Sequence, residues 1–452
     1  MRIISRSMTD SEHDIVDYAL RAARAAGADG ADITFITGDS TDIQVRLGKV
    51  ESTERAEDYQ LGLRVFCGKQ NAAVSTGQLD RQNIDDIVAR AVAMARAAPE
   101  DAFARLASED EQARTLPDIA ICDETELSSE ALTQMALQCE TAALETNGIT
   151  NSDGGSASAS KSRILIATST GFSAEYERSS FGFSAVVLAE QNVQMERDYD
   201  YSSAVFAEDL KDPAEVGKNA AQRTLSRLGA RKPQTGTYPV IFDTRISRSI
   251  AGHLAGAING AAIARGTSFL KDRLGEKIAS EQINIIDDPL RDRASGSRLF
   301  DGETLPVTQR NLVDQGVLTG WLLDLASAGQ LGMTPTGNAS RSLSGPPGPS
   351  VSNFYIADTD IETAELIADI KDGFFVTELM GSSISMTTGD YSRGAAGFWI
   401  ENGKIGWPAS EATIAGNLND IFASMVAGND IDMTQSISAP TLFIPSLMVA
   451  GA

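Results

Sequence analysis

The sequence predicts an α+β protein made of two domains, an N-terminal domain (residues 8–235) and a C-terminal domain (residues 236–452). Three observations support this prediction. Helix-like and strand-like hydrophobic patterns occur twice in the same order before residue 230, a stretch rich in Pro and Gly follows, and short strand-like segments dominate afterwards. A length of 452 residues also exceeds what one ordinary core supports. We therefore expect two tandem helix–strands–helix units, followed by a mostly β domain with a buried helix.

The first predicted unit begins with a helix. Thr9 and Glu12 form the capping box T-D-S-E ahead of an apolar stripe, so a helix is expected over residues 10–26. Extended segments rich in β-forming residues follow between residues 31 and 76. A second apolar stripe at helical spacing ends before Pro99, and it predicts the closing helix of the unit.

The same order of elements recurs further along the chain. A helix is expected over residues 128–146, strands between 164 and 205, and another helix over 213–228 with a proline in its first turn. The polar tract S-D-G-G-S-A-S-A-S-K-S (152–162) predicts a flexible loop. The repeated order indicates a duplication within the N-terminal half.

The pattern changes beyond A-R-K-P-Q-T-G-T-Y-P (230–239), which is the expected domain boundary. One helix rich in Ala and Gly is predicted over residues 245–264, buried among many short strands. Asn402-Gly403 between apolar flanks is the strongest hairpin signal in the chain. The segment 337–352 is rich in Gly, Pro and Ser, and it predicts a long surface loop.

Composition and charge exclude several classes of protein. A formal charge of −24 disfavours contact with nucleic-acid phosphates, so no nucleic-acid partner is expected. Three cysteines, Cys67, Cys122 and Cys139, match neither a disulfide framework nor a metal motif, and we expect buried, reduced thiols. The start of the chain lacks the apolar core of a secretion signal, and no apolar run reaches the roughly 18 residues of a membrane span. A cytoplasmic location without membrane contact is expected.

Catalytic motifs are scarce. The chain has two histidines, His13 in a charged helical turn and His253 in the predicted buried helix, so any His-based mechanism would have to use one of them. No G-x-S-x-G elbow, P-loop or G-x-G-x-x-G occurs. S-x-x-K occurs at 268–271 and 158–161 without the companion motifs of a Ser/Lys hydrolase, and such short matches arise easily by chance. The pair Asp287-Asp288 before a proline predicts a turn at a strand end rather than a metal site.

Several long motifs of the C-terminal half resemble one known family. They are RSIAGHLAGAINGAAIARGTSFLKDRLGEKI (248–278), IIDDP (285–289), SRLFDGE (297–303), TGDYSRGAAGFWIENGKI (388–405) and EATIAGNL (411–418). Together they resemble the PmbA/TldE branch of the TldD/PmbA family, and the similarity extends over the chain from about Met8. Members also carry the name modulator of DNA gyrase, although the acidic charge here gives no reason to expect DNA binding.

The resemblance implies a subunit of a TldD/TldE peptidase, in which two homologous subunits cleave unfolded or short peptides inside a closed chamber. The catalytic subunit, TldD, carries H-E-x-x-x-H and a C-terminal cysteine, which hold zinc and activate water. If His253 matches the second histidine of that motif, Arg248 takes the place of the first and Ser249 that of the glutamate. All three cysteines precede residue 140. We therefore expect no metal in this chain and zinc only in a TldD-type partner.

Three residues are candidates for contact with a substrate or partner: His253, Asp390 and Arg393. His253 lies on the flank of an apolar helical stripe, where packing within the core is the simpler interpretation and substrate contact the alternative. Asp390 and Arg393 belong to T-G-D-Y-S-R-G, predicted to be a glycine-bounded turn. An ion pair between them is the simpler interpretation, and the alternative is binding of peptide carbonyls or a C-terminal carboxylate by Arg393.

The leading hypothesis is therefore a non-catalytic or co-catalytic subunit that acts through assembly and peptide handling, and that is inactive alone. Its expected partners are a TldD-type catalytic subunit and a peptide or unfolded protein, with self-association left open. The runner-up is an independent homo-oligomeric peptide-binding or scaffold protein without a proteolytic role. A third hypothesis is an autonomous hydrolase that uses residues outside the known motifs.

Overall fold

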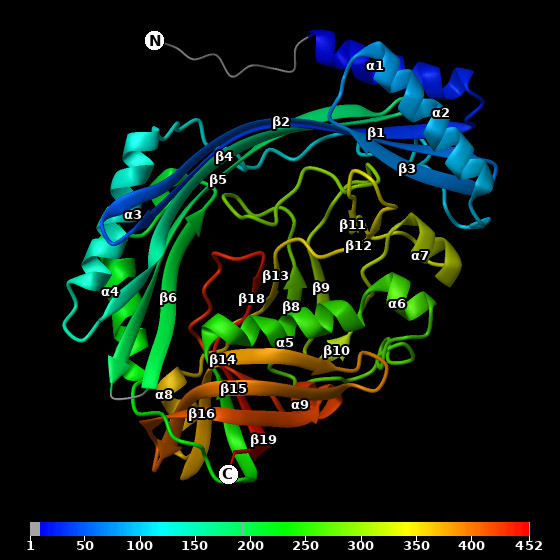
Figure 1. Ribbon diagram of the computed structural model, residues 1–452. Helices are drawn as coiled ribbons and strands as arrows, with labels where there is room; N and C mark the ends of the chain where they lie inside the picture. The colour runs from blue at the N-terminus through cyan, green and yellow to red at the C-terminus, as the bar shows by residue number, and fades with distance from the viewer. Residues whose placement is uncertain (1–9, 192–193, 452) are drawn as a thin grey trace.

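The computed structural model describes residues 10–191 and 194–451, and the chain is an α+β protein, as predicted (Figure 1). Thr9, part of the predicted capping box, lies outside these residues. The structure contains a large curved sheet near the N-terminus, a closed sheet near the C-terminus, and helix α5 between them (Figure 1). No helix in the described ranges has the length and apolar character needed to cross a membrane.

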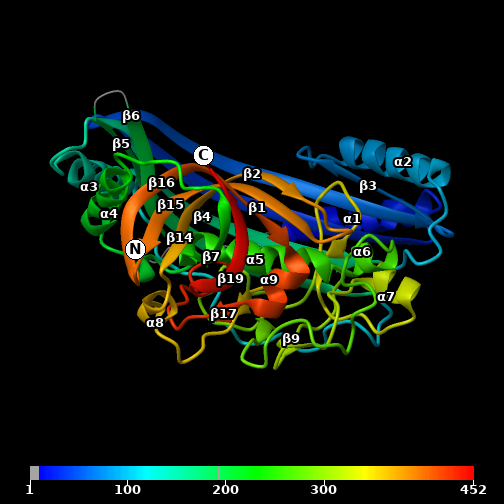
Figure 2. The same cartoon turned by 90° about the horizontal axis from the view of Figure 1, so that it is seen from below.

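The large sheet is antiparallel throughout, with strand order β3-β2-β1-β4-β5-β6. Its strands are β1 (Gly30–Arg46), β2 (Lys49–Cys67), β3 (Gln70–Thr76), β4 (Asn151–Thr168), β5 (Ser173–Gln191) and β6 (Gln194–Ala204). Figures 1 and 2 show helices on its convex side, α1 and α2 at one end and α3 and α4 at the other. These helices are α1 (Asp10–Ala25), α2 (Arg81–Ala97), α3 (Ser129–Leu144) and α4 (Pro213–Ser226). The concave side faces the rest of the molecule.

The predicted flexible loop at residues 152–162 is wrong, because this tract lies inside strand β4, paired with β1 on one side and β5 on the other. Its small residues alternate with period two. Gly155 and Ala157 face α3, where a Cβ on Gly155 would lie 2.9 Å from the carbonyl oxygen of Ala136. Ser160 and Ser162 line a hollow on the concave side. The residues of this tract are polar because one face of the strand is open. They are small because the other face packs closely against a helix.

The C-terminal sheet has the order β16-β15-β14-β7-β19-β17, and a further pairing of β16 with β19 closes it. Its strands are β7 (Gly236–Phe242), β14 (Asp372–Ile384), β15 (Asp390–Glu401), β16 (Lys404–Asn417), β17 (Val426–Ala427) and β19 (Leu442–Ala450). The predicted hairpin is confirmed, because Glu401 pairs with Lys404 and both intervening residues, Asn402 and Gly403, have positive φ.

The predicted helix over 245–264 is two helices, α5 (Thr244–Ala257) and α6 (Gly260–Ala264). The side chain of Asn259 accepts hydrogen bonds from the amides of Ala261 and Ala262, so it caps a new helix instead of continuing the old one. Helix α5 is buried along one face, as predicted, and packs between β14 of the closed sheet and strands β13 and β18.

Short elements complete the C-terminal part. The strands are β8 (Ile285–Asp287), β9 (Arg310–Asp314), β10 (Val317–Leu318), β11 (Ala339–Ser340), β12 (Gly348–Pro349), β13 (Phe354–Ile356) and β18 (Ile437–Ser438). The helices are α7 (Leu325–Leu331), α8 (Thr363–Ala368), α9 (Leu418–Ser424) and the short 3₁₀ turn η1 (Ala207–Asp209). The largest cluster of buried apolar side chains lies wholly between Val240 and Val449, and it unites α5 with both C-terminal sheets.

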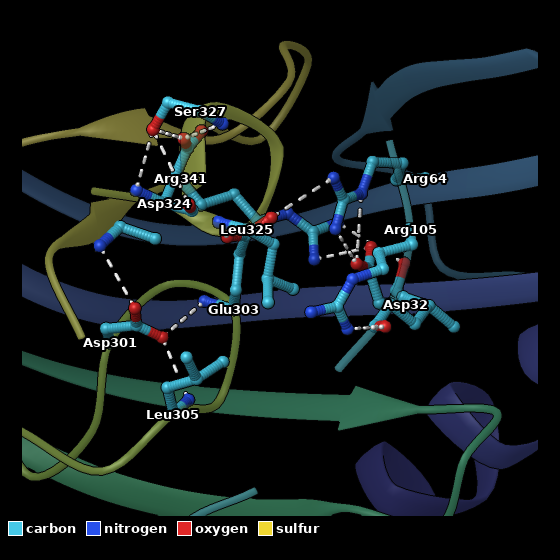
Figure 3. Close-up of polar contacts among 12 residues, drawn as sticks. Asp32, Arg64, Arg105, Asp301, Glu303, Leu305, Asp324, Leu325, Ser327 and Arg341 are labelled. Carbon is cyan, nitrogen blue, oxygen red and sulfur yellow. Dashed lines mark hydrogen bonds and ion pairs between the residues drawn. The ribbon is translucent and has the colours of Figure 1, made fainter. Parts of the chain in front are cut away.

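A buried ion cluster joins the large sheet to the C-terminal part (Figure 3). The Asp32 carboxylate on β1 lies 2.5 Å from Arg64 Nη2 on β2 and 2.5 Å from Nη1 of Arg341. Arg64 is also 3.9 Å from Glu303, whose other oxygen accepts a hydrogen bond from the amide of Leu325. The four ionisable side chains are 2–4% exposed, so water screens them little.

The segment 337–352 is only partly a surface loop, because its first residues carry this ion cluster. Arg341 is buried against the large sheet, and a Cβ on Gly62 of β2 would lie 2.3 Å from the carbonyl oxygen of Leu343. Only glycine at position 62 therefore permits this approach of the two backbones. The prediction missed the contact because composition reports polarity and not which distant strand the loop meets.

We expect Arg341→Met to lower the free energy of unfolding by about 3–5 kcal/mol, because removing one partner leaves Asp32 buried with half of its neutralising charge. Urea unfolding measures this change. Arg273→Met is the matched control, since Arg273 pairs with Glu276 at the surface and such a pair contributes about 0–1 kcal/mol. Equal effects of the two substitutions would contradict a stabilising role for the cluster.

The division into units at residues 8–235 and 236–452 stays a prediction. We expect brief digestion by a nonspecific protease to cut first within 231–235 or 342–346, where exposed residues occur outside helices and long strands. Tract 152–162 and helix α5 should resist, because their backbone amides are paired. Mass spectrometry of the fragments identifies the sites. An early cut in β4 or α5 would contradict the paired, buried state of these segments.

Candidate functional site

A cleft rich in arginine lies between the large sheet and helix α5. It has a volume of about 270 Å³ and is bounded by β6, the C-terminal end of α4, the N-terminal half of α5, and strands β14 and β15. Five arginines line it, and we call it the arginine cleft: Arg197, Arg227, Arg245, Arg248 and Arg393. Two carboxylates, Asp198 and Glu378, also line it, which leaves an excess of positive charge in a chain of formal charge −24.

Three of these arginines already have carboxylate partners. Arg227 pairs with Glu378 and lies 3.4 Å from Asp198. Arg245 pairs with the same Asp198 at 3.1 Å, and Arg197 is 3.1 Å from Asp153. Within residues 10–191 and 194–451, neither Arg248 nor Arg393 forms a hydrogen bond through its side chain or an ion pair. The cleft therefore holds two half-buried cations whose charge is not neutralised by a direct contact.

Helix α5 presents Arg248 and Ser249 to this cleft. Asp243 caps the helix by accepting a hydrogen bond from the amide of Arg245 at 2.9 Å. Buried side chains along the opposite face fix the helix against the core. The Ser249 hydroxyl donates to the carbonyl oxygen of Ile246 at 2.7 Å, so it is held by its own helix.

His253 contacts Tyr391 of β15 in an edge-to-face arrangement, with ring centroids 5.8 Å apart. Tyr391 is 2% exposed. Among the described residues, three buried atoms lack a hydrogen-bond partner here: His253 Nε2, Tyr391 Oη and Arg393 Nε. Buried polar atoms are nearly always hydrogen-bonded, so three together are typical of a place that accepts a polar ligand.

The electrostatics of this corner keep the histidine neutral. Burial, together with the charge of Arg393, lowers the pKa of His253 to about 4. Burial also raises the pKa of the Tyr391 hydroxyl, and Arg393 opposes that shift. At neutral pH the corner thus offers one guanidinium, a neutral imidazole and a neutral phenol.

The structure brings His253 and Arg393 together but places Asp390 elsewhere. The predicted ion pair between Asp390 and Arg393 is wrong, because Asp390 instead accepts hydrogen bonds from Thr388 at 2.6 Å and Asn417 at 3.2 Å. The predicted turn ends at Gly389, and Asp390 is already the first residue of β15. Residues three apart on a strand point to opposite faces, so the two charges separate.

The other sequence candidates form no reacting pair. Ser268 donates to the carbonyl oxygen of Ala257 at 2.5 Å, and Lys161 lies 3.1 Å from Glu177. The turn predicted at Asp287-Asp288 is confirmed: β8 ends at Asp287, and Asp288 accepts a hydrogen bond from the amide of Leu290. Asp287 itself is buried and accepts a hydrogen bond from the Ser352 amide at 2.6 Å.

All three thiols are free. Cys139 is buried as predicted, and burial raises its pKa to about 12, which keeps the thiol protonated. The prediction of buried thiols is wrong for Cys67 and Cys122, which are only half-buried. Across the described ranges, no three or more His, Cys, Asp or Glu side chains gather in a group able to hold a metal ion.

The arginine cleft continues into two further cavities. It shares Arg245 and Arg248 with a small cavity of about 100 Å³, and that cavity shares Ser203 and Thr434 with a hollow of about 590 Å³. The hollow lies under the concave side of the large sheet, whose hydroxyl groups line it: Ser160, Ser162, Ser179, Ser180 and Ser203. The three cavities thus adjoin one another in a row between the large sheet and the C-terminal part.

Sequence motifs missed most of this site. Its arginines come from β6, α4, α5 and β15, and no local spacing connects them. The one usable signal was the alternation of serine with small residues in 152–162, which is typical of a strand and predicts a row of hydroxyl groups on one face.

Comparison with known proteins defines the class. Models of the PmbA/TldA metallopeptidases match residues 31–95 (domain 1), 122–228 (central domain) and 235–451 (C-terminal domain). The chain belongs to the PmbA/TldD metallopeptidase family. It is 35% identical to metalloprotease PmbA of Escherichia coli O157:H7, an alignment that covers 100% of this chain and 99% of the relative. A metalloprotease TldD homolog of Buchnera aphidicola subsp. Acyrthosiphon pisum is 26% identical over 61% of this chain and 60% of the relative.

Solved structures share the fold. A protein of Bacteroides thetaiotaomicron described as a modulator of DNA gyrase aligns with a TM-score of 0.91 and 27% identity, over 99% of this chain and 100% of that chain. TldE from Thermococcus kodakarensis aligns with a TM-score of 0.85 and 18% identity, over 98% of this chain and 100% of that chain. At 18% identity this second likeness concerns the fold alone.

We expect His253 to titrate with a pKa of about 4, and Arg393→Gln to raise that value by removing a repelling charge. Because an unfolded histidine titrates near 6.5, the unfolded state binds the proton first, and stability falls as pH drops from 6.5 towards 4. NMR titration of the ring signals measures the pKa. With only two histidines, His13→Gln assigns the spectrum. Titration of His253 near 6.5 in the unaltered chain would contradict the burial argument.

Proposed function

We propose that this chain is a non-catalytic or co-catalytic subunit of a peptidase, which handles unfolded or extended peptides in the cytoplasm together with a TldD-type zinc subunit. The observation that carries the proposal concerns the family's metal motif. If His253 matches the second histidine of H-E-x-x-x-H, this chain has Arg248 and Ser249 where the catalytic subunit has His and Glu, and both of these residues line the arginine cleft.

These residues do not fit a zinc ion. Arg248 is a permanent cation, and it cannot serve as a ligand. Ser249 supplies no carboxylate base, and its hydroxyl already donates to Ile246. His253 alone cannot hold catalytic zinc, which takes three protein ligands in known sites. Hydrolysis by a metal route also needs an activated water, so these side chains support a role in binding rather than in turnover.

The row of cavities supports peptide handling. It combines hydroxyl groups, which hydrogen-bond to peptide carbonyls and amides, with a cationic end. None of the three cavities is large enough for a folded domain. This size limit supports a substrate class of unfolded chains.

One edge of the large sheet supports assembly with a partner. Strand β2 pairs with β1 from Lys49 to Phe66, but with β3 only from Leu61 onward. The segment 49–60 is exposed on both faces apart from a half-buried Ser52, and no strand among the described residues pairs with its outer edge. Unpaired strand edges are places where another chain can add.

We expect the purified chain to cleave no peptide alone, and to raise cleavage at least tenfold when mixed with an H-E-x-x-x-H partner. The reason is that the partner supplies the activated water while this chain completes the binding surface. The assay measures cleavage of an unstructured fluorogenic peptide by each chain and by the mixture, each with and without a chelator. Arg273→Gln provides a folded control for charge removal at the surface.

Metal analysis accompanies the assay. About one zinc per chain, lost in His253→Ala, would contradict the proposal, as would a partner that works equally well alone. Peptide binding without any effect on the partner would support instead an independent peptide-binding or scaffold protein. Cleavage by this chain alone in the presence of chelator would favour an autonomous hydrolase.

A further inference from the structure

We propose that the arginine cleft is a carboxylate-binding site, in which Arg393 and Arg248 bind an anionic group of the peptide. The inference rests on the proposed function only in taking a peptide as the ligand. It requires no proteolysis and no partner subunit. Within the cleft, it assigns ligand binding to these two arginines and not to Arg197, Arg227 or Arg245.

The pairing pattern singles out the two residues. Arg197, Arg227 and Arg245 are held by carboxylates of this chain, whereas Arg248 and Arg393 have no such partner within the described ranges. Removing a cation from water without a counter-ion is unfavourable, so an evolved cleft with two unpaired guanidinium groups is expected to receive an anion. The excess acidic charge of the chain as a whole makes this local positive cluster more distinctive.

The hydrogen-bonding geometry favours a carboxylate. Arg393 has a buried Nε–H without a partner, and a guanidinium presents parallel donors that match the two oxygens of a carboxylate. Tyr391 lies two residues before Arg393 on the same side of β15, and neither it nor His253 lines the cleft. A carboxylate bound in the cleft therefore meets the donors of the two unpaired arginines.

The row of cavities indicates how the anion arrives. The cleft lies at one end of the row, and the hollow lined by hydroxyl groups lies at the other. An extended peptide whose backbone occupies the hollow would place its C-terminal carboxylate, or an acidic side chain near its end, in the arginine cleft. A polyanion such as a nucleic acid is disfavoured by the formal charge of −24.

The test uses the full chain without a partner. The probe is an unstructured octapeptide of Ala, Gly and Ser with an N-terminal fluorophore, made with either a free C-terminal carboxylate or a C-terminal amide. Fluorescence anisotropy measures binding. We expect the amide to bind about tenfold to a hundredfold more weakly, because it loses charge-assisted hydrogen bonds. A third peptide, amidated and containing one Asp near its end, distinguishes the two sources of carboxylate.

Substitutions locate the site. Arg393→Gln and Arg248→Gln should each weaken binding of the free-acid peptide about tenfold and leave the amide unaffected, while Arg273→Gln, a surface change, should have no effect. Ring signals of His253 should shift on binding, and those of His13 should not. If Arg393→Gln fails to fold, Arg248→Gln and the comparison of the free-acid peptide with the amide peptide still test the inference.

Two results would overturn the inference: equal affinity for the acid and amide peptides, or no saturable binding of the acid peptide at millimolar concentration. Restored binding by the amidated Asp peptide would support it with an acidic side chain as the source. These outcomes are independent of cleavage assays. Carboxylate binding without any effect on a partner enzyme would leave the site standing and contradict only the proposed function.

Discussion

The arrangement of the molecule depends on the buried ion cluster between the large sheet and the C-terminal part. Asp32 takes two guanidinium groups, Arg64 from the neighbouring strand and Arg341 from a loop some three hundred residues away in sequence. Burial raises the pKa of Glu303 to about 8 in spite of Arg64, which shows how strongly this place is shielded from water. Apolar contacts around Phe300 and Leu305 also cross between the two parts, as do the pairs of Arg227 with Glu378 and of Arg245 with Asp198.

Helix α5 connects the C-terminal core to the candidate site. Its buried face packs against both C-terminal sheets, and its other face supplies Arg245 to Asp198 of the large sheet. The same helix therefore belongs to the core and to the boundary between the two parts. Arg248 lies one turn beyond that contact, and His253 lies where the helix meets β15. Rotation of the helix would break the Arg245 contact, so the backbone position of Arg248 is fixed together with the core.

Local signals in the sequence predicted local structure. Apolar stripes predicted the helices and Asn402-Gly403 predicted the hairpin, because their physical causes lie within a few residues. The tract 152–162 became a strand because β1 and β5 pair with it from afar, and the break at Asn259 was overlooked although Asn is a strong helix cap. The ion pair expected within 388–394 failed because strand pairing, which the sequence does not state, put its charges on opposite faces. Long-range pairing decided the first and the last of these cases, whereas the break at Asn259 has a local cause.

The replacement of a zinc motif by Arg248 and Ser249 has a consistent physical interpretation under the proposed alignment. A zinc ion and a guanidinium both attract oxygen ligands, but only the metal lowers the pKa of a bound water enough to produce a nucleophile near neutral pH. Replacing the zinc ion by a guanidinium keeps the attraction for a peptide oxygen. It removes the activated water that would attack the peptide carbonyl. A carboxylate carries a full negative charge, so it gains more from a guanidinium than a neutral peptide carbonyl does. The same place in the fold would therefore change from a site that cuts a chain to a site that holds its charged end, and neutral His253 nearby adds no further positive charge.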